Sequence, residues 1–409
     1  MKRIVLPWLA TLVTLLSAVS DGGQPVQLPK LPKFEAPVIG NSSMPTLLPA
    51  LRTAPAPGWV RPGTRITYYS AAAAIPGERY LYYRDEDGNW VDEHGRSYRR
   101  EAEASASGHG YTQVNVVAMS QEAVVLGIRS YGLLNVTGPP VLMSSAGGVD
   151  VPGCTGDYWA NPAILKQAVG MQAEHTVVLR MPYTIQSRTY QAIRVQYATR
   201  HAKMAYVFDE PTGVLLFTNS SVFNPVTHRT TLAYSSYRGT RTVAIPWAAD
   251  AVPNWLAAIQ RAQFSGSYAV TIPGTPVIPM AMSAQAQVKS RGVNWLQYTL
   301  TVTMGGVQGM PPQINQAEAV SGYAQIGGLF VSPVGLRKLR QGQVIDRDTF
   351  TQVTATVSAV GQGAVTISEV GPGQRTDFTY STQTGMLTAL RMVNQHLHMQ
   401  RELRLTGTQ

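Results

Sequence analysis

The chemically richest stretch of the sequence runs from residue 75 to residue 98. It holds the densest group of aromatic and acidic side chains, and its candidate binding residues are Tyr82, Tyr83, Asp85, Asp87 and Trp90. Asp-Gly between two strand-like runs is a strong signal for a β-hairpin, on which the acids would simply be solvated. In the functional interpretation, the hairpin is a flap whose rings and carboxylates contact a ligand or a partner.

Histidine and cysteine offer little for metal or nucleophilic chemistry. His396 and His398 would share one face of a strand, but two ligands do not make a site and no acidic or cysteine partner lies nearby in the sequence. Cys154 is the only cysteine, so it cannot form an intramolecular disulfide, and we interpret it as a small packed residue. We expect no metal site.

The sequence motifs of the large catalytic classes are missing. The chain has no G-x-S-x-G elbow, no H-E-x-x-H zinc motif, no P-loop and no G-x-G-x-x-G turn. These absences favour a protein without enzymatic activity and without a cofactor.

The N-terminus has the layout of a secretory signal peptide. Lys2 and Arg3 precede an apolar run from Ile4 to Leu16, and small residues follow. The run is shorter than the roughly 20 residues that a membrane-spanning helix needs. We expect residues 1–20 to be removed and the mature protein to be periplasmic or extracellular, with no transmembrane segment.

The net charge suggests anionic partners only weakly. The formal charge is +10, and it becomes +8 (31 basic minus 23 acidic residues) when Lys2 and Arg3 are removed with the signal peptide. A basic surface attracts anionic lipids or cell-wall polymers. The chain has no dense basic run, so it carries no specific signal for nucleic acid.

Residues 21–58 form a proline-rich linker or arm. Proline lacks an amide donor and disfavours helix in the residue before it, so the segment is predicted to be extended. A second interpretation is that the arm lies across the folded body, because it contains apolar side chains that could be buried there, among them Leu28, Leu31, Phe34, Val38, Ile39, Leu47 and Leu48.

After Trp59 the sequence changes to short runs rich in Val, Thr, Tyr and Ile, separated by Gly, Pro, Asn and Asp. Such runs are typical of antiparallel strands. One helix is predicted over residues 161–170, where Asn161 caps, Pro162 suits the first turn and Gly170 ends the helix.

Three motifs recur in the same order at nearly one offset, which indicates an internal duplication. The pairs are Trp159 with Phe330 (330 − 159 = 171), Gly213 with Gly385 (385 − 213 = 172) and Val116 with Val288 (288 − 116 = 172). We therefore predict a mainly β fold of tandem duplicated antiparallel β-sheet domains, each a curved sheet or half-barrel with one short helix. The domains cover about residues 59–245 and 250–409.

The paired residues have architectural roles. Trp159 and Phe330 each precede a capped helix, onto which the ring can pack. Pro162 and Pro333 suit the first turns of those helices. Gly213 and Gly385 each follow a threonine in a hairpin turn, where a positive φ is expected.

The first copy is longer than the second near its start. Trp59 and Trp255 begin corresponding segments at an offset of 255 − 59 = 196, which exceeds the later offset of 172 by 24 residues. The extra residues are assigned to an inserted hairpin at about residues 75–98.

The leading functional hypothesis is a non-enzymatic binding protein of the bacterial cell envelope. By analogy with the half-open barrels of periplasmic lipid and lipoprotein carriers, a curved sheet could enclose an apolar, lipid-like or anionic envelope ligand. The alternative is a structural or adhesive surface protein built from tandem β domains. The sequence leaves the ligand and the oligomeric state open.

Overall fold

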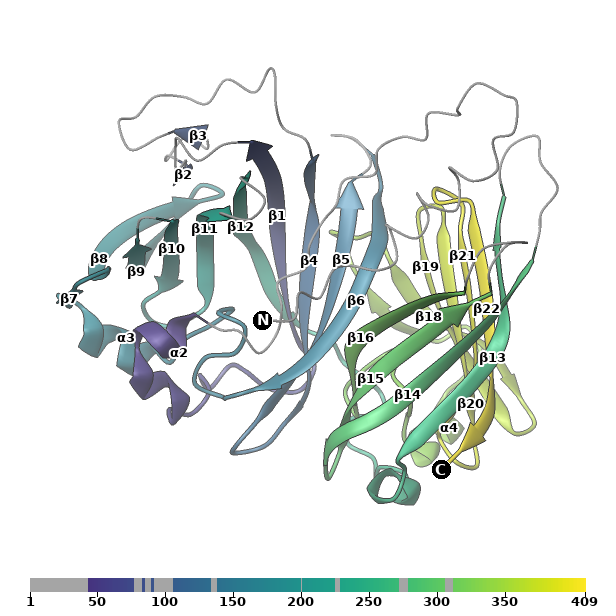
Figure 1. The fold of residues 1–409 in the computed structure, drawn as a ribbon. Coiled ribbons are helices and arrows are strands. Elements are labelled where there is room, and N and C mark those ends of the chain that lie inside the picture. Colours follow the sequence, from purple (N-terminus) through teal and green to yellow (C-terminus); the bar gives the residue numbers. More distant parts are fainter. Residues whose placement is uncertain are drawn as a thin grey trace, which may run out of the picture.

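A computed structural model describes residues 43–76, 83–84, 90–91, 106–133, 138–199, 201–224, 229–271, 279–305 and 312–409. It contains two antiparallel sheets of 10 strands each, which follow one another along the chain. Figure 1 shows both as strongly curved sheets that lie next to each other, the first in blue and teal and the second in green and yellow. The predicted fold class is confirmed, and we call the two units the first and second half-barrels.

Both half-barrels have the same strand order. The first runs β6 (Pro140–Asp150), β5 (Val124–Leu133), β4 (Ala106–Met119), β1 (Thr64–Pro76), β12 (Arg229–Thr242), β11 (Leu215–Asn224), β10 (Ala202–Asp209), β9 (Arg188–Ala198), β8 (Thr176–Ile185) and β7 (Gln172–Ala173). The second runs β16 (Gln313–Gly322), β15 (Trp295–Met304), β14 (Met280–Gly292), β13 (Arg261–Val270), β22 (Met399–Thr408), β21 (Leu387–Asn394), β20 (Gln374–Ser381), β19 (Ala364–Gly371), β18 (Thr354–Gly361) and β17 (Val344–Arg347).

Several register irregularities coincide as well. The β1–β12 ladder shifts between Thr67 and Tyr68, and the β13–β22 ladder shifts at the equivalent step, before Phe264. The β10–β11 ladder shifts before Phe208, and the β20–β21 ladder shifts before Tyr380. These pairs differ by 264 − 68 = 196 and 380 − 208 = 172 residues, the two offsets found in the sequence. Bulges at equivalent places bend equivalent strands, which gives both sheets the same curvature.

Short helices close one end of each half-barrel. In the first, α3 (Pro162–Ala168) begins after Asn161, whose side chain accepts hydrogen bonds from two amides of the first turn. In the second, α4 (Pro333–Lys338) begins after Ser332, whose side chain accepts one. The other helical segments are α2 (Met44–Leu47) and the 3₁₀ turns η1 (Pro49–Arg52) and η2 (Asn254–Ala257).

The aromatic residues before these helices have the same surroundings in both copies. Trp159 forms an isolated bridge to Val214, and the ring of Trp59 packs on its edge at a centroid distance of 6.0 Å. Phe330 bridges Met386, and Trp255 packs on it at 6.2 Å. Each of the two flanking tryptophans donates its indole N–H to a threonine carbonyl at 2.7 Å. The rings of Trp159 and Phe330 are both fully buried, as packing onto the sheet requires.

The hairpin glycines are also equivalent. Gly213 and Gly385 both have a φ of +73°, which confirms the expected positive φ. A Cβ at Gly213 would lie 2.0 Å from the carbonyl oxygen of Ala160, and one at Gly385 would lie 2.1 Å from that of Val331. Glycine is therefore needed at each position for two reasons. The backbone has a positive φ, and the segment before the helix approaches too closely to leave room for a Cβ.

The predicted insertion is described only in part. Tyr83–Arg84 (β2) pairs antiparallel with Trp90–Val91 (β3), and Ile75 and Pro76 continue strand β1. Tyr82, Asp85, Asp87 and most of the segment lie outside the described residues.

The proline-rich arm packs into the first half-barrel where it is described. Met44 and Leu51 are fully buried and Leu48 is 5% exposed, all within the core cluster of the first sheet. This outcome fits the interpretation that the arm lies across the folded body. Leu28, Leu31, Phe34, Val38 and Ile39 lie outside the described residues.

The two half-barrels meet through a small apolar cluster. Val117, Ala118 and Val125 of the first half-barrel pack with Val320 of the second, and all four are nearly or fully buried. The backbones come close enough here for the amide of Ala324 to donate to the carbonyl of Val117 at 3.1 Å.

Candidate functional site

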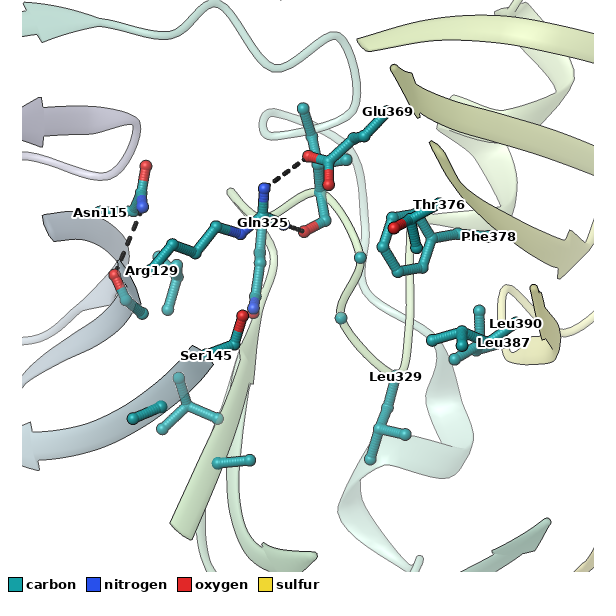
Figure 2. Close-up of a pocket in the computed structure, with 18 of the residues that line it drawn as sticks. Asn115, Arg129, Ser145, Gln325, Leu329, Glu369, Thr376, Phe378, Leu387 and Leu390 are labelled. Carbon is teal, nitrogen blue, oxygen red and sulfur yellow. Dashed lines mark hydrogen bonds and ion pairs between the residues drawn. The ribbon is translucent and has the colours of Figure 1, made fainter. Parts of the chain in front are cut away.

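The main cavity of the described residues lies in the second half-barrel and has a volume of about 240 Å³. Its lining comes from the inward faces of β13–β16 and β19–β22, from the loop before α4 and from the outer face of β4–β6. Figure 2 shows the arrangement, with Asn115, Arg129 and Ser145 of the first half-barrel opposite Phe378, Leu387 and Leu390 of the second.

Most of the cavity surface is apolar because side chains alternate between the two faces of each strand, and those on the inward face are mainly apolar. Side chains on one face of a strand recur every second residue. Met282 and Ala284 of β14, and Leu300 and Val302 of β15, therefore point to the same interior, and Phe264 does so from β13. This set resembles the apolar lining of small-molecule pockets, in which a few polar groups fix the orientation of the ligand.

The equivalent space in the first half-barrel is filled by the arm. Asp157 accepts hydrogen bonds from the backbone amides of Ser43 and Met44 at 2.9 and 3.0 Å. Its counterpart in the second copy is Gly328 (328 − 157 = 171), which lines the cavity. Met44 packs in one cluster with Tyr206, whose counterpart Phe378 also lines the cavity. The arm thus occupies in the first copy the region that is hollow in the second.

Burial changes the pKa of Asp157, the acid that holds the arm. Desolvation raises the pKa of Asp157, and the two amide hydrogen bonds from the arm oppose that rise. The thiol of Cys154 lies 3.7 Å from the same carboxyl group, and burial raises the pKa of the thiol well above its usual value. A protonated, buried thiol is a poor nucleophile, so the structure agrees with a packed Cys154.

Ion pairs between the half-barrels form one wall of the cavity. Arg129 donates to Glu369 at 2.6 Å and to the carbonyl of Ile326 at 3.0 Å (Figure 2). Burial alone would lower the pKa of Arg129, but the Glu369 carboxylate raises it, so the guanidinium stays charged. This buried pair fixes the position of the loop before α4 relative to the first sheet.

A second ionic cluster lies beside this wall. Arg65 and Arg241 of the first half-barrel both contact Asp346 and Asp348 of the second, with shortest distances of 2.7 and 2.6 Å. Burial opposes ionisation of Asp348, but the amide of Thr351 and the two guanidinium groups lower its pKa below the usual value. The Asp348 carboxylate is therefore held ionised at the junction.

One further cation belongs to the cavity lining. Arg401 lies on β22 directly across from Tyr268 of β13. Burial lowers the pKa of its guanidinium to about 10, with the phenol of Tyr268 as a smaller, opposing influence. At neutral pH the group therefore remains positively charged. Arg401 was not among the residues predicted from the sequence, although it interrupts an alternating apolar pattern formed by Met399, Leu403 and Leu405.

The candidate binding residues of the inserted hairpin are not brought to this cavity by any described contact. Tyr83 and Trp90 lie on β2 and β3, and the other three candidates lie outside the described residues. His396 and His398 lie in the turn between β21 and β22 and not on a strand. Within the described residues, no group of three or more His, Cys, Asp and Glu side chains is arranged to hold a metal ion. No helix of the described segments is long and apolar enough to cross a bilayer.

Comparisons with known proteins give only distant likenesses. No family model and no curated protein matches the sequence. A protein of unknown function from the DUF3598 family of Nostoc punctiforme is 9% identical, with 85% of this chain and 96% of that chain covered and a TM-score of 0.15. MucB is 11% identical over 69% of this chain and 93% of its own, with a TM-score of 0.22. The MucA/MucB complex of Pseudomonas aeruginosa gives 13% identity, 61% and 87% coverage and a TM-score of 0.17. At these TM-scores the likenesses support no conclusion on function.

Proposed function

We propose that this chain is a non-enzymatic binding protein of the bacterial cell envelope that holds an apolar, lipid-like ligand in its second half-barrel. The proposal takes residues 59–245 and 250–409 as the two domains, and export through the N-terminal signal as the route to the periplasm or the cell exterior. The hollow interior of the second half-barrel supports it best, because the same interior in the first copy is filled by Met44 and its neighbours.

The size of the cavity limits the ligand. A volume of 240 Å³ corresponds to roughly eight water molecules at about 30 Å³ each. If a methylene group needs about the same space as a water molecule, an alkyl chain of roughly eight to ten carbons fits. A lipid with longer chains would extend beyond the cavity.

The apolar lining favours an alkyl chain, but apolar contacts alone give only weak binding. Transfer of a methylene group from water contributes about 0.8 kcal/mol, so eight to ten groups give roughly 6–8 kcal/mol before the cost of association. Lost translational and rotational freedom reduces this by several kcal/mol. The expected affinity for a purely apolar chain is therefore weak, with a dissociation constant of about 1 mM or higher.

The competing hypothesis is a structural protein of tandem β domains, in which the cavity stays empty. Native mass spectrometry of the protein purified from its own envelope separates the two, since a carrier retains a co-purifying mass of lipid size. A flap role for Tyr82, Tyr83, Asp85, Asp87 and Trp90 is a separate proposal, tested by deleting the hairpin and measuring the same retained mass.

A binding assay with a cavity-filling variant gives a sharper test. Ala284 lines the cavity from β14, whereas Ala281 lies exposed on the opposite face of the same strand. Ala284→Leu should abolish the binding of decan-1-ol measured by isothermal titration calorimetry, and Ala281→Leu should leave it unchanged. Equal binding by both variants, or no binding by the unmodified protein, would contradict the proposed function.

A further inference from the structure

The charged residues of the cavity lining fall into two groups. Arg65, Arg129 and Glu369 belong to the wall between the half-barrels, where they form ion pairs across the junction. Arg401 belongs to the inner face of the second sheet, among apolar side chains. The first group explains the junction between the copies, whereas Arg401 lies within the hollow itself.

The direction of the Arg401 side chain follows from its strand. Met399, Leu403 and Leu405 of β22 belong to, or pack against, the core of the second half-barrel, and they alternate with exposed or partly exposed residues. Arg401 has the same parity, so its side chain projects inward. Its cross-strand neighbour Tyr268 is 3% exposed, and Arg401 itself is partly buried.

A comparison of the copies shows that this cation is specific to the hollow half-barrel. Arg401 pairs with Tyr268, and the equivalent pair in the first copy is Ala233 with Ala72 (268 − 72 = 196). The first copy, whose interior is filled by the arm, thus has alanine where the second has arginine. A guanidinium in the wall of an apolar cavity favours a ligand with an anionic group over a neutral one.

We propose that the cavity takes a single-chain carboxylate, with its head group on Arg401 and its aliphatic chain running along Leu403 and Phe264. The inference rests on the proposed function and names the ligand class of that site. The planar guanidinium matches a carboxylate with two parallel N–H···O bonds, a geometry that a lysine cannot reproduce. An alkyl chain of roughly eight to ten carbons has the length that the cavity volume allows.

The test compares decanoate with decan-1-ol, which share one chain length and differ in the charge of the head group. Calorimetric titration of the unmodified protein should give a dissociation constant about 10- to 100-fold lower for decanoate, as expected for a charged hydrogen-bonded head group. Arg401→Met should remove this preference and leave decan-1-ol binding within about twofold. Arg401→Lys should give an intermediate affinity for decanoate.

Arg404→Met provides the matched control. Arg404 lies on the same strand with an exposed side chain that pairs with Glu402, so its loss should not change the binding of either probe. Equal affinities of the unmodified protein for the two probes would overturn the carboxylate assignment, as would equal effects of Arg401→Met and Arg404→Met. If Arg401→Met fails to fold, the ratio of the two affinities in the unmodified protein still decides. Binding of neither probe would instead overturn the proposed function.

Discussion

The two half-barrels share their strand order, several bulges and the hairpin turns at Gly213 and Gly385, yet one interior is filled and the other is hollow. In the first, Met44, Leu48 and Leu51 of the arm join the core. In the second, the corresponding region is a cavity of about 240 Å³. The common strand arrangement depends on a few turn and bulge residues. Whether the interior is filled depends on whether a segment from outside the sheet, such as the arm, packs into it. The two copies thus keep the same curved sheet but differ in their interiors.

The residues that differ between the interiors explain how they diverged. Asp157 holds the arm through two amide hydrogen bonds, and its counterpart Gly328 has no side chain to do so. Ala233 leaves the first interior apolar, and its counterpart Arg401 brings a charge into the second. The interior of the first half-barrel therefore holds a segment of the same chain, whereas the second has a cavity with a cation in its wall.

The largest effect is expected from truncating the arm side chain that fills the first interior. Met44→Ala removes a fully buried side chain and should lower the free energy of unfolding by about 2–5 kcal/mol. Met282→Ala is the matched change in the second interior. Met282 already borders the cavity, so its truncation should cost only roughly 1–2 kcal/mol. Chemical denaturation followed by circular dichroism measures both, and equal losses would mean that the interiors are not filled differently.

A smaller effect, equal in the two copies, is expected at the hairpin glycines. Gly213→Val and Gly385→Val should each destabilise by about 1–3 kcal/mol, because valine is strained at a φ of +73° and its Cβ meets a carbonyl oxygen. Gly170→Ala is a control for the strain alone, since Gly170 has a φ of +90° with no atom within 4 Å of an added Cβ. It should cost about 1 kcal/mol. Thermal unfolding that showed a loss in only one copy would refute the equivalence of the turns.

The smallest expected effect is on the pH dependence of stability, to which Asp157 of the first half-barrel and Asp348 of the second contribute with opposite signs. The lowered pKa of Asp348 means that its ion pairs stabilise the fold fully above about pH 4, and that this stability is lost as the pH falls through the lowered value. The raised pKa of Asp157 has the opposite sign, because the folded state binds the proton more tightly. Stability is then lost as the pH rises from about 4 through the raised value.

Substitution by asparagine isolates these two contributions. Asp348→Asn should flatten the loss of stability below about pH 4, and Asp157→Asn should flatten the loss above it. Urea denaturation at a series of pH values measures both slopes. If both substitutions changed the pH dependence of the free energy of unfolding in the same direction relative to the unmodified protein, the assignment of opposite pKa shifts would be contradicted.

The frame of the fold was predictable because it depends on residues with strong local preferences. Gly213 and Gly385 mark hairpins, Asn161 and Pro162 mark a helix start, and Trp159 and Phe330 mark the segment before each helix. Such residues act through the backbone of their own neighbourhood, so their pattern survives in the sequence of both copies. The offsets of 171, 172 and 196 follow from them.

The cavity could not be predicted in the same way. A void depends on the summed volume of side chains from many strands and on whether the arm enters, and neither quantity is local in sequence. The one usable signal was a charge at Arg401 within an alternating apolar strand. The aromatic and acidic residues of the inserted hairpin drew attention instead, because they are dense along the chain.

The junction between the half-barrels has a consequence for assembly. The copies use different surfaces to meet, so the contact is heterologous, and such contacts can repeat without closing. The surface that Val117, Ala118 and Val125 present to the second half-barrel recurs in that half-barrel as Lys289, Ser290 and Gln297 (289 − 117 = 172), and Lys289 is exposed. A further copy would have to bury that ammonium group against an apolar face. The second half-barrel is therefore polar where the equivalent surface of the first is apolar, a difference also found in the end repeats of repeat proteins, whose polar outer face keeps them soluble.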